Sequence, residues 1–429
     1  MLNVVGFRCG VCAATVDVAA PLPWRCPNAV GGDRHHVLQI VRRMAPLRPT
    51  DDRNPFVSYD GELAWAAFAE ANGMTADART ALVRELDDAV REVDGTGFGV
   101  TPFARSAALS DALAFTPDGG VWVKDETRNV AGSHKARHLF TALLHLRAAE
   151  LLGLAPWPGS SSSGRPPLAI ASCGNAALAA ATLARAAAWP IEVFVPDWAD
   201  PAVIARLTEL DALITTCERR ADDLPGDPTV LRFREAVDAG AVPFSAQGPE
   251  NALCLDGGRT IGWEMSEIPD TDVQGCAPDR VFVQVGGGAF AACVGAAFRA
   301  AGVHPILHAV QTEGCAPLAL AWERAGADGH PERRWAEIMT PWPGPHSIAD
   351  GILDDETYDW IGVFEAMRDC GGTPVVASED LIVRAHELAS STGIDVSPTG
   401  SAGLAGLLAI RDQIDDGERV VVVFSGIAR

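Results

Sequence analysis

The sequence predicts an α/β fold with mainly parallel sheets flanked by helices. Short apolar runs repeatedly lead into a turn that contains glycine or asparagine, and then into a long helical segment. Strand, turn and helix in that order are typical of parallel sheets. Hydrophobic residues make up 48% of the chain and many are alanines, which favours helices packed on a sheet. A chain of 429 residues is long enough for two lobes and an appendage.

Charge and composition predict which classes of binding partner are excluded and where the protein is located. A formal net charge of -22 repels nucleic acid and anionic membrane surfaces, so we expect neither as a partner. No apolar run approaches the ~20 residues of a membrane span, and the first residues lack a signal-peptide pattern. Most of the ten cysteines stand singly, which indicates reduced thiols and a cytoplasmic location.

Residues 1–97 form an extension that precedes the predicted core and carries three cysteines near its start. Cys9, Cys12 and Cys26 resemble a zinc ribbon whose second Cys-x-x-Cys half is incomplete. Structural zinc takes four ligands, so a zinc site here needs His35 or His36 as the fourth. The alternative is a degenerate ribbon with free thiols.

The segment around Lys135 is the centre of the prediction. Val121–Val123 reads as a strand, a polar turn with Gly132 follows, and a helix with Ser133 as N-cap is expected to run to about Leu152. Lys135 then lies in the first turn of a helix that follows a strand, where cofactor sites of α/β folds lie. The positive end of the helix dipole disfavours an ammonium there, which suits a lysine that reacts through its amine. A solvated surface lysine is the alternative.

Two further turns join predicted strands to predicted helices. Ser172–Asn175 is a strand-to-helix turn whose free N–H groups suit a carboxylate. Gly286–Gly288 lets backbone N–H groups form an anion nest, reinforced by the following helix N-terminus. The spacing of these glycines does not match a dinucleotide fingerprint. The predicted strands span residues 168–171, 191–195, 281–285 and 420–424, and the predicted helices span 176–188, 290–300 and a pair within 61–93 that is broken at Asn72-Gly73.

The motif Lys-Asp-Glu-x-x-Asn-x-x-Gly-Ser-x-Lys-x-Arg at residues 124–137 resembles the cofactor-lysine motif of the fold-type-II pyridoxal-phosphate (PLP) enzymes. These include threonine synthase, the threonine and serine ammonia-lyases and the tryptophan synthase β-chain. Three more motifs follow in the family's order, and the resemblance covers residues 98–429. It implies a large PLP-binding lobe from residues 98–135 and 248–429, and a small lobe from residues 136–247 that carries the Ser-x-Gly-Asn loop.

The resemblance also implies roles for individual residues. Lys135 would be the catalytic lysine that carries PLP, and Asn175 would bond the phenolic oxygen of PLP. The remaining cofactor contacts would come from Gly286, Gly287, Gly288 and Ala289 at the phosphate, from His134 at the phosphate or the substrate, and from Thr399 (or else Ser401) at the pyridine nitrogen. Ser172, Cys173 and Gly174 would bind the substrate. His134 stands where many relatives have phenylalanine, and a packing role is an equal alternative.

A hydroxyl at the ring nitrogen makes PLP a weaker electron sink than an aspartate would, which favours expulsion of a leaving group. We therefore expect β-elimination from a hydroxy amino acid, a small-molecule substrate such as threonine or serine, giving a 2-oxo acid and ammonia. Ser397–Gly400 and Ala136 favour this chemistry. A threonine-synthase-like or other replacement enzyme is the first alternative, supported by the cysteine element and by residues 251–265. A non-catalytic PLP-fold protein is the second. The resemblance also implies a homodimer.

Overall fold

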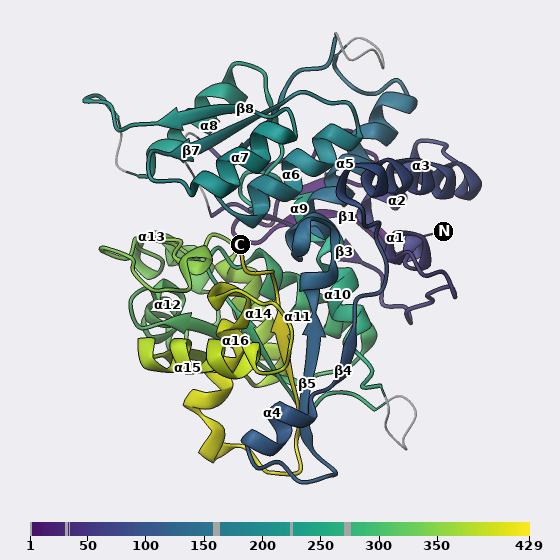
Figure 1. The fold of residues 1–429 in the computed structure, drawn as a ribbon. Coiled ribbons are helices and arrows are strands. Elements are labelled where there is room, and N and C mark those ends of the chain that lie inside the picture. Colours follow the sequence, from purple (N-terminus) through teal and green to yellow (C-terminus); the bar gives the residue numbers. More distant parts are fainter. Residues whose placement is uncertain (1, 31–32, 34, 158–163, 224–225, 270–275) are drawn as a thin grey trace.

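Two parallel sheets stand in separate halves of the molecule and carry the fold (Figure 1). The structure, a computed structural model, describes residues 2–30, 33, 35–157, 164–223, 226–269 and 276–429. The predicted α/β class with mainly parallel sheets is confirmed. Along these residues, no helix is both long and apolar enough to cross a bilayer.

The larger sheet has the strand order β12-β11-β10-β13-β5-β4, in which β4 alone is antiparallel to its neighbour. Its strands are β4 (Phe103–Arg105), β5 (Gly120–Asp125), β10 (Arg280–Gln284), β11 (Ile306–Thr312), β12 (Pro374–Ala377) and β13 (Arg419–Phe424). The helices of this half are α4 (Ala107–Ala112), α9 (Cys254–Gly257), α10 (Arg259–Glu264), α11 (Ala289–Ala301), α12 (Pro317–Ala325), α13 (Trp335–Ile338), α14 (Trp360–Cys370), α15 (Glu379–Ser390) and α16 (Pro398–Ala409). In this half α11 packs on α14, and α15 packs on α16.

The smaller sheet has the order β8-β7-β6-β9 and is parallel throughout. Its strands are β6 (Leu168–Ala171), β7 (Ile191–Pro196), β8 (Leu213–Cys217) and β9 (Val242–Pro243). The helices beside it are α5 (Lys135–Leu151), α6 (Asn175–Ala186), α7 (Pro201–Glu209) and α8 (Pro228–Asp238). Short 3-10 turns are η1 (Asp60–Glu62), η2 (Glu126–Arg128), η3 (Val130–Gly132), η4 (Pro331–Arg334), η5 (Asp350–Ile352) and η6 (Arg411–Gln413).

The N-terminal extension has its own antiparallel sheet and then a pair of helices. The sheet has the order β2-β1-β3, and the helix pair is broken where the sequence predicts. Thr75 caps the second helix by accepting the N–H of Ala78. The elements are β1 (Val4–Cys9), β2 (Thr15–Asp17), β3 (Leu38–Arg42), α1 (Pro55–Ser58), α2 (Ala64–Ala71) and α3 (Ala76–Asp94). Because α2 packs on α5 and α3 on α6, the extension shares one hydrophobic core with the smaller half.

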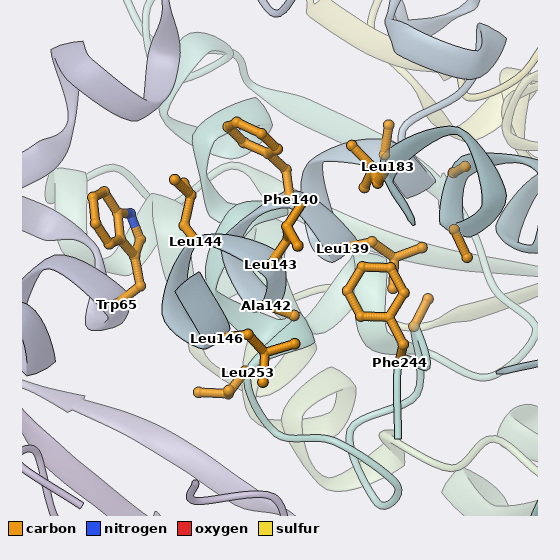
Figure 2. Packing of buried hydrophobic residues seen from close by; sticks show 14 of the residues in the cluster. Trp65, Leu139, Phe140, Ala142, Leu143, Leu144, Leu146, Leu183, Phe244 and Leu253 are labelled. Atoms are coloured by element: carbon orange, nitrogen blue, oxygen red, sulfur yellow. The ribbon is translucent and has the colours of Figure 1, made fainter. Parts of the chain in front are cut away.

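Helix α5, which begins at Lys135, is buried on almost every side. Figure 2 shows Leu139, Phe140 and Leu143 of this helix among apolar side chains from α2 and the smaller half, including Trp65 and Phe244. Helix α5 packs on α2 of the extension, on α6 of the smaller half and on α9 of the larger half. Three parts of the chain therefore fix the position of α5.

The start of α5 differs by one position from the sequence-based expectation. Ser133 is not the N-cap, because His134 precedes the first helical residue and the Ser133 hydroxyl accepts no N–H from the described first turn. The preceding Gly132 has φ +65°, and a Cβ on it would lie 2.6 Å from Ile427 Cγ2. The close contact with the C-terminal segment therefore sets where the helix begins.

A buried group of four charges lies beneath the start of α5. Lys124 Nζ lies 2.5 Å from Glu264 Oε2, and Arg137 Nη1 lies 2.5 Å from Glu264 Oε1. Arg137 Nε is 3.6 Å from Glu126 Oε2, and none of the four side chains is more than 3% exposed. Burial alone would raise the pKa of Glu264, but the charges of Arg137 and Lys124 lower it. The four charges balance, and they join β5, η2, α5 and α10.

Glu264→Gln should destabilise the protein because it leaves two buried cations facing one carboxylate. We expect the free energy of unfolding to fall by about 3–5 kcal/mol, measured by chemical denaturation at pH 7. Glu323→Gln, on the exposed side of α12, is the matched control and should change it by less than about 0.5 kcal/mol. Equal effects of the two substitutions would contradict the role given to the network.

Candidate active site

The loops that carry the predicted site residues meet at Gly426, just beyond the end of β13. Ser133 pairs with Gly426 in an antiparallel bridge, and the Ser397 N–H donates to the Gly426 carbonyl at 3.0 Å. A Cβ on Gly426 would lie 2.7 Å from Asn175 Nδ2. Glycine is therefore required here by close approach from both halves of the molecule.

Two neutral histidines lie beside Lys135. His134 packs its ring 4.3 Å from that of Phe290, in the first turn of α11, and its backbone N–H donates to the Ser425 carbonyl at 3.0 Å. Burial, followed by the charge of Lys135, lowers the pKa of His134 well below its ordinary value and that of His138 to about 3. Both imidazoles are therefore uncharged at neutral pH.

Two carboxylic acids, the buried Asp359 and the partly exposed Asp354, also lie near Lys135. Burial raises the pKa of Asp354 to about 6 and that of Asp359 to about 7, while the charge of Lys135 lowers both. Asp359 Oδ2 accepts the N–H of Gly248 at 3.1 Å, and Oδ1 has no hydrogen-bond partner in the described chain. No local sequence pattern marks these two acids, because both come from a segment more than 200 residues beyond Lys135.

The glycine loop after β10 has the features of an anion-binding nest. A Cβ on Gly286 would lie 2.5 Å from Asp354 Oδ2, and Gly288 has φ +92°. Helix α11 begins at Ala289, so the N–H groups of its first turn lack intrahelical acceptors. A Cβ on Gly287 would lie 3.5 Å from the same carboxylate oxygen, so an anionic group already lies against the loop.

The turn after β6 places its residues at the start of α6, as predicted. Ser172 Oγ accepts the N–H of Gly174 at 3.3 Å, and the helix begins at Asn175. Asn175 Oδ1 accepts from Arg429 Nε at 2.8 Å, which ties this turn to the C-terminal segment of the other half. Cys173 lies between Ser172 and Gly174 and is partly exposed.

Acidic residues surround this turn. Burial raises the pKa of the Cys173 thiol, and the charges of Asp350 and Asp227 raise it further. The charges of Asp355 and Asp227 likewise raise the pKa of Asp354. Asp350 and Asp227 therefore place negative charge near Cys173.

The hydroxyl of Thr399 is fully engaged. Thr399 Oγ1 donates to Asp350 Oδ1 at 3.0 Å and accepts the N–H of Gly351 at 2.9 Å. Ser401, the alternative to Thr399 at the pyridine nitrogen, is buried within α16. Its hydroxyl donates to the Ser397 carbonyl at 3.1 Å. Neither hydroxyl has a proton left to give a ligand.

Ser425 is a site residue that the sequence prediction missed. Its Oγ accepts from Gln284 Nε2 at 2.7 Å, and its own proton has no acceptor in the described part of the chain. It follows β13 directly and adjoins the loop that carries Lys135. The sequence feature that could have identified Ser425 is its position directly after a buried strand and before Gly426.

The N-terminal cysteines do not join these loops. Cys9, Cys12 and Cys26 gather with His36 around the end of β1.

Comparison with known proteins shows what the chain resembles. The sequence profile described as "Pyridoxal-phosphate dependent enzyme" matches residues 95–426. The chain is 25% identical to a threonine synthase of Methanosarcina acetivorans over 340 residues, which cover 76% of this chain and 74% of that protein. It is 26% identical to an L-threonine ammonia-lyase of Thermotoga maritima over 322 residues, covering 74% and 70%. The fold matches that of threonine deaminase isoform 2 from Solanum lycopersicum with a TM-score of 0.61 at 17% identity, covering 91% of this chain and 96% of that one.

Asp359→Asn tests the electrostatics of the site through pH dependence. The pKa of Asp359 is raised from 3.8 to about 7, so the native state holds its proton more tightly than the unfolded state does. Stability from this group is present at low pH and is lost as pH rises from about 4 to 7. The free energy of unfolding of Asp359→Asn, relative to the unsubstituted protein, should thus rise by about 4 kcal/mol between pH 4 and pH 8.

Chemical denaturation at both pH values measures this difference, and Asp111→Asn, on the exposed side of α4, is the control. A pH-independent difference for Asp359→Asn would refute the raised pKa.

Proposed function

The chain belongs to the pyridoxal-phosphate-dependent enzyme family, with its two-lobed type II fold, and we propose that it deaminates a hydroxy amino acid by β-elimination. It is an enzyme of the ammonia-lyase or threonine-synthase-like type. Threonine and serine are the proposed substrates, and a 2-oxo acid and ammonia are the products.

The residues present fit PLP. The glycine loop accepts an anion, as the contact between Gly287 and Asp354 indicates, and close packing leaves no room for a side chain at Gly286. Two buried polar atoms near Lys135, His134 Nδ1 and Ser133 Oγ, have no hydrogen-bond partner in the described chain. Unpaired buried polar atoms are costly, so such atoms commonly mark a place for a ligand.

Each loop then has a proposed role toward the cofactor. Lys135 would hold PLP through its amine, Gly286–Gly288 would bind the phosphate, and Asn175 would bond the phenolic oxygen. When bound, PLP supplies the electron sink that makes the substrate α-proton acidic. Asp354 would leave the loop or take up a proton when phosphate binds, and its raised pKa makes protonation inexpensive.

The remaining chemistry falls to the side chains of this chain. The Lys135 amine would remove the proton at the substrate Cα and hold it at Nζ. That proton can then pass to the departing β-hydroxyl, which leaves as water. The N–H groups of Ser172–Asn175 would orient the substrate carboxylate, because a helix N-terminus favours an anion.

The negative charge that Asp350 and Asp227 place near Cys173 is the observation that carries the choice of substrate. The charges of Asp350 and Asp227 raise the pKa of Cys173, which lies in the proposed substrate loop. A side chain that carries a phosphate dianion would meet like charges there, whereas a neutral hydroxyl would not. The nearby Arg429 is engaged with Asn175 and the Ala131 carbonyl.

A threonine-synthase-like replacement reaction is the second candidate function. The match to a threonine synthase is as extensive as the match to an ammonia-lyase, which is the specific observation in its favour.

The first experiment titrates the purified PLP-bound protein with threonine, serine and O-phosphohomoserine. We expect threonine or serine to shift the visible absorbance of the bound cofactor and to release a 2-oxo acid and ammonia. Lys135→Ala should remove both the absorbance and the activity. Phosphate release from O-phosphohomoserine without 2-oxo acid from the other two would move the assignment to the replacement reaction.

Ser425 is proposed as the hydroxyl that meets the pyridine nitrogen, in place of Thr399. A neutral ring nitrogen needs a donor, and the Ser425 proton is free whereas that of Thr399 is given to Asp350. Ser425→Ala should weaken PLP binding by about tenfold, the equivalent of about 1.4 kcal/mol. Thr399→Val is the comparison and should weaken it less.

PLP affinity is measured by equilibrium titration of the apo-protein. A larger effect of Thr399→Val than of Ser425→Ala would restore the assignment that the sequence resemblance implies.

A further inference from the structure

Three thiols and one imidazole converge at the end of β1, outside the site described above. The Sγ atoms of Cys9, Cys12 and Cys26 and a ring nitrogen of His36 all lie within 4.8 Å of one another. Cys12 Sγ and Cys26 Sγ are 3.5 Å apart. Two sulfurs bound to one tetrahedral zinc lie about 3.8 Å apart, given Zn–S bonds of about 2.3 Å. The four donors are thus close enough together to share a single zinc ion.

The fold brings these donors together through contacts that do not involve a metal. Cys9 ends β1 and pairs with Leu38 at the start of β3, which places His36 beside it. Cys26 comes from a separate segment that is anchored by the bond from the Ala252 N–H to the Trp24 carbonyl at 2.9 Å. The arrangement therefore follows from the backbone and is not the product of one flexible loop.

The surroundings of the four donors match those of metal-bound ligands. His36 Nδ1 is buried without a hydrogen-bond partner among the described residues, while Nε2 lies 3.5 Å from Asp33 Oδ2. A metal-bound histidine commonly gives its other ring N–H to a carboxylate in this way. Asn28 directs its backbone N–H toward Cys26 Sγ at 3.4 Å and its side-chain amide toward Cys12 Sγ at 3.5 Å. N–H groups aimed at sulfur stabilise thiolates.

We propose that Cys9, Cys12, Cys26 and Nδ1 of His36 bind one structural zinc ion. Four protein ligands leave no open coordination position, so the ion does not take part in the reaction. Sulfur-rich sites of this kind select zinc over magnesium or calcium. A disulfide between Cys12 and Cys26 is the competing arrangement, but it would use two of the four donors and leave His36 Nδ1 unpaired.

The zinc centre also connects the extension to the wall of the active site. His35, next to the ligand His36, stacks its ring 3.9 Å from that of Trp335 and lies 3.3 Å from Trp360 Nε1. Trp360 follows Asp359, the buried acid near Lys135. Loss of the metal should therefore loosen the segment that holds Asp359.

Metal analysis of the full-length protein tests the proposal. Protein purified without added metal should contain about one zinc per chain. Cobalt substituted for zinc should show the visible absorption of a tetrahedral ion with thiolate charge-transfer bands. Cys12→Ser and His36→Ala should lose the zinc, whereas the controls Cys370→Ser and His35→Ala should keep it.

The cobalt spectrum of the unsubstituted protein shows whether a tetrahedral metal site exists even if a variant fails to fold. Absence of zinc and of a tetrahedral cobalt spectrum, or a Cys12–Cys26 disulfide found by mass spectrometry, would overturn the proposal. Loss of zinc in His35→Ala with retention in His36→Ala would overturn the choice of ligand.

Hydrogen exchange measures the connection to the active site separately. Removal of zinc by a chelator should speed exchange at residues 355–364, with no change at residues 402–408 in the buried helix α16. Equal exchange at residues 355–364 with and without zinc would show that the centre stabilises the extension alone and would refute the connection.

Discussion

A balanced group of four buried charges fixes the position of Lys135. Lys124 and Arg137 face Glu126 and Glu264 with almost no access to water. Charges so placed are costly unless each is paired, so the four segments that supply them must be in register. Arg137 lies two residues beyond Lys135 on the same helix. The requirement for pairing therefore sets the depth and rotation of that helix, and with it the place of the Lys135 amine.

The two halves of the molecule meet where the backbone leaves no room for side chains. Gly426 adjoins Ser133 and Asn175, which belong to loops after strands of different sheets. Arg429 extends this contact by bonding to Asn175. The last residues of the chain thus complete a site whose first part lies some 290 residues earlier, as expected where ligands bind at the carboxyl ends of parallel strands.

The N-terminal extension is part of the folded body and is not a loose appendage. Its helices share a core with the smaller half and pack against the same helix α5 that begins at Lys135. Its cysteine-bearing segment contacts residues 250–252 and Trp360 in the larger half. The extension therefore touches both halves, and it can transmit the state of a metal centre to the wall of the site.

The sequence by itself determined the elements whose signals are local. Strand, turn and helix were readable around Lys135, Asn175 and the glycine loop because each turn follows its strand directly. The tertiary structure decided what depends on distant segments. Ser133 is not a cap and instead forms a bridge with Gly426, just beyond the last strand. Ser425 was identified as a site residue by its unpaired hydroxyl proton, and the fold of β1 and β3 brings His36 to the cysteines. Local propensity specifies an element, whereas burial and unpaired hydrogen-bonding groups are properties of the assembled chain.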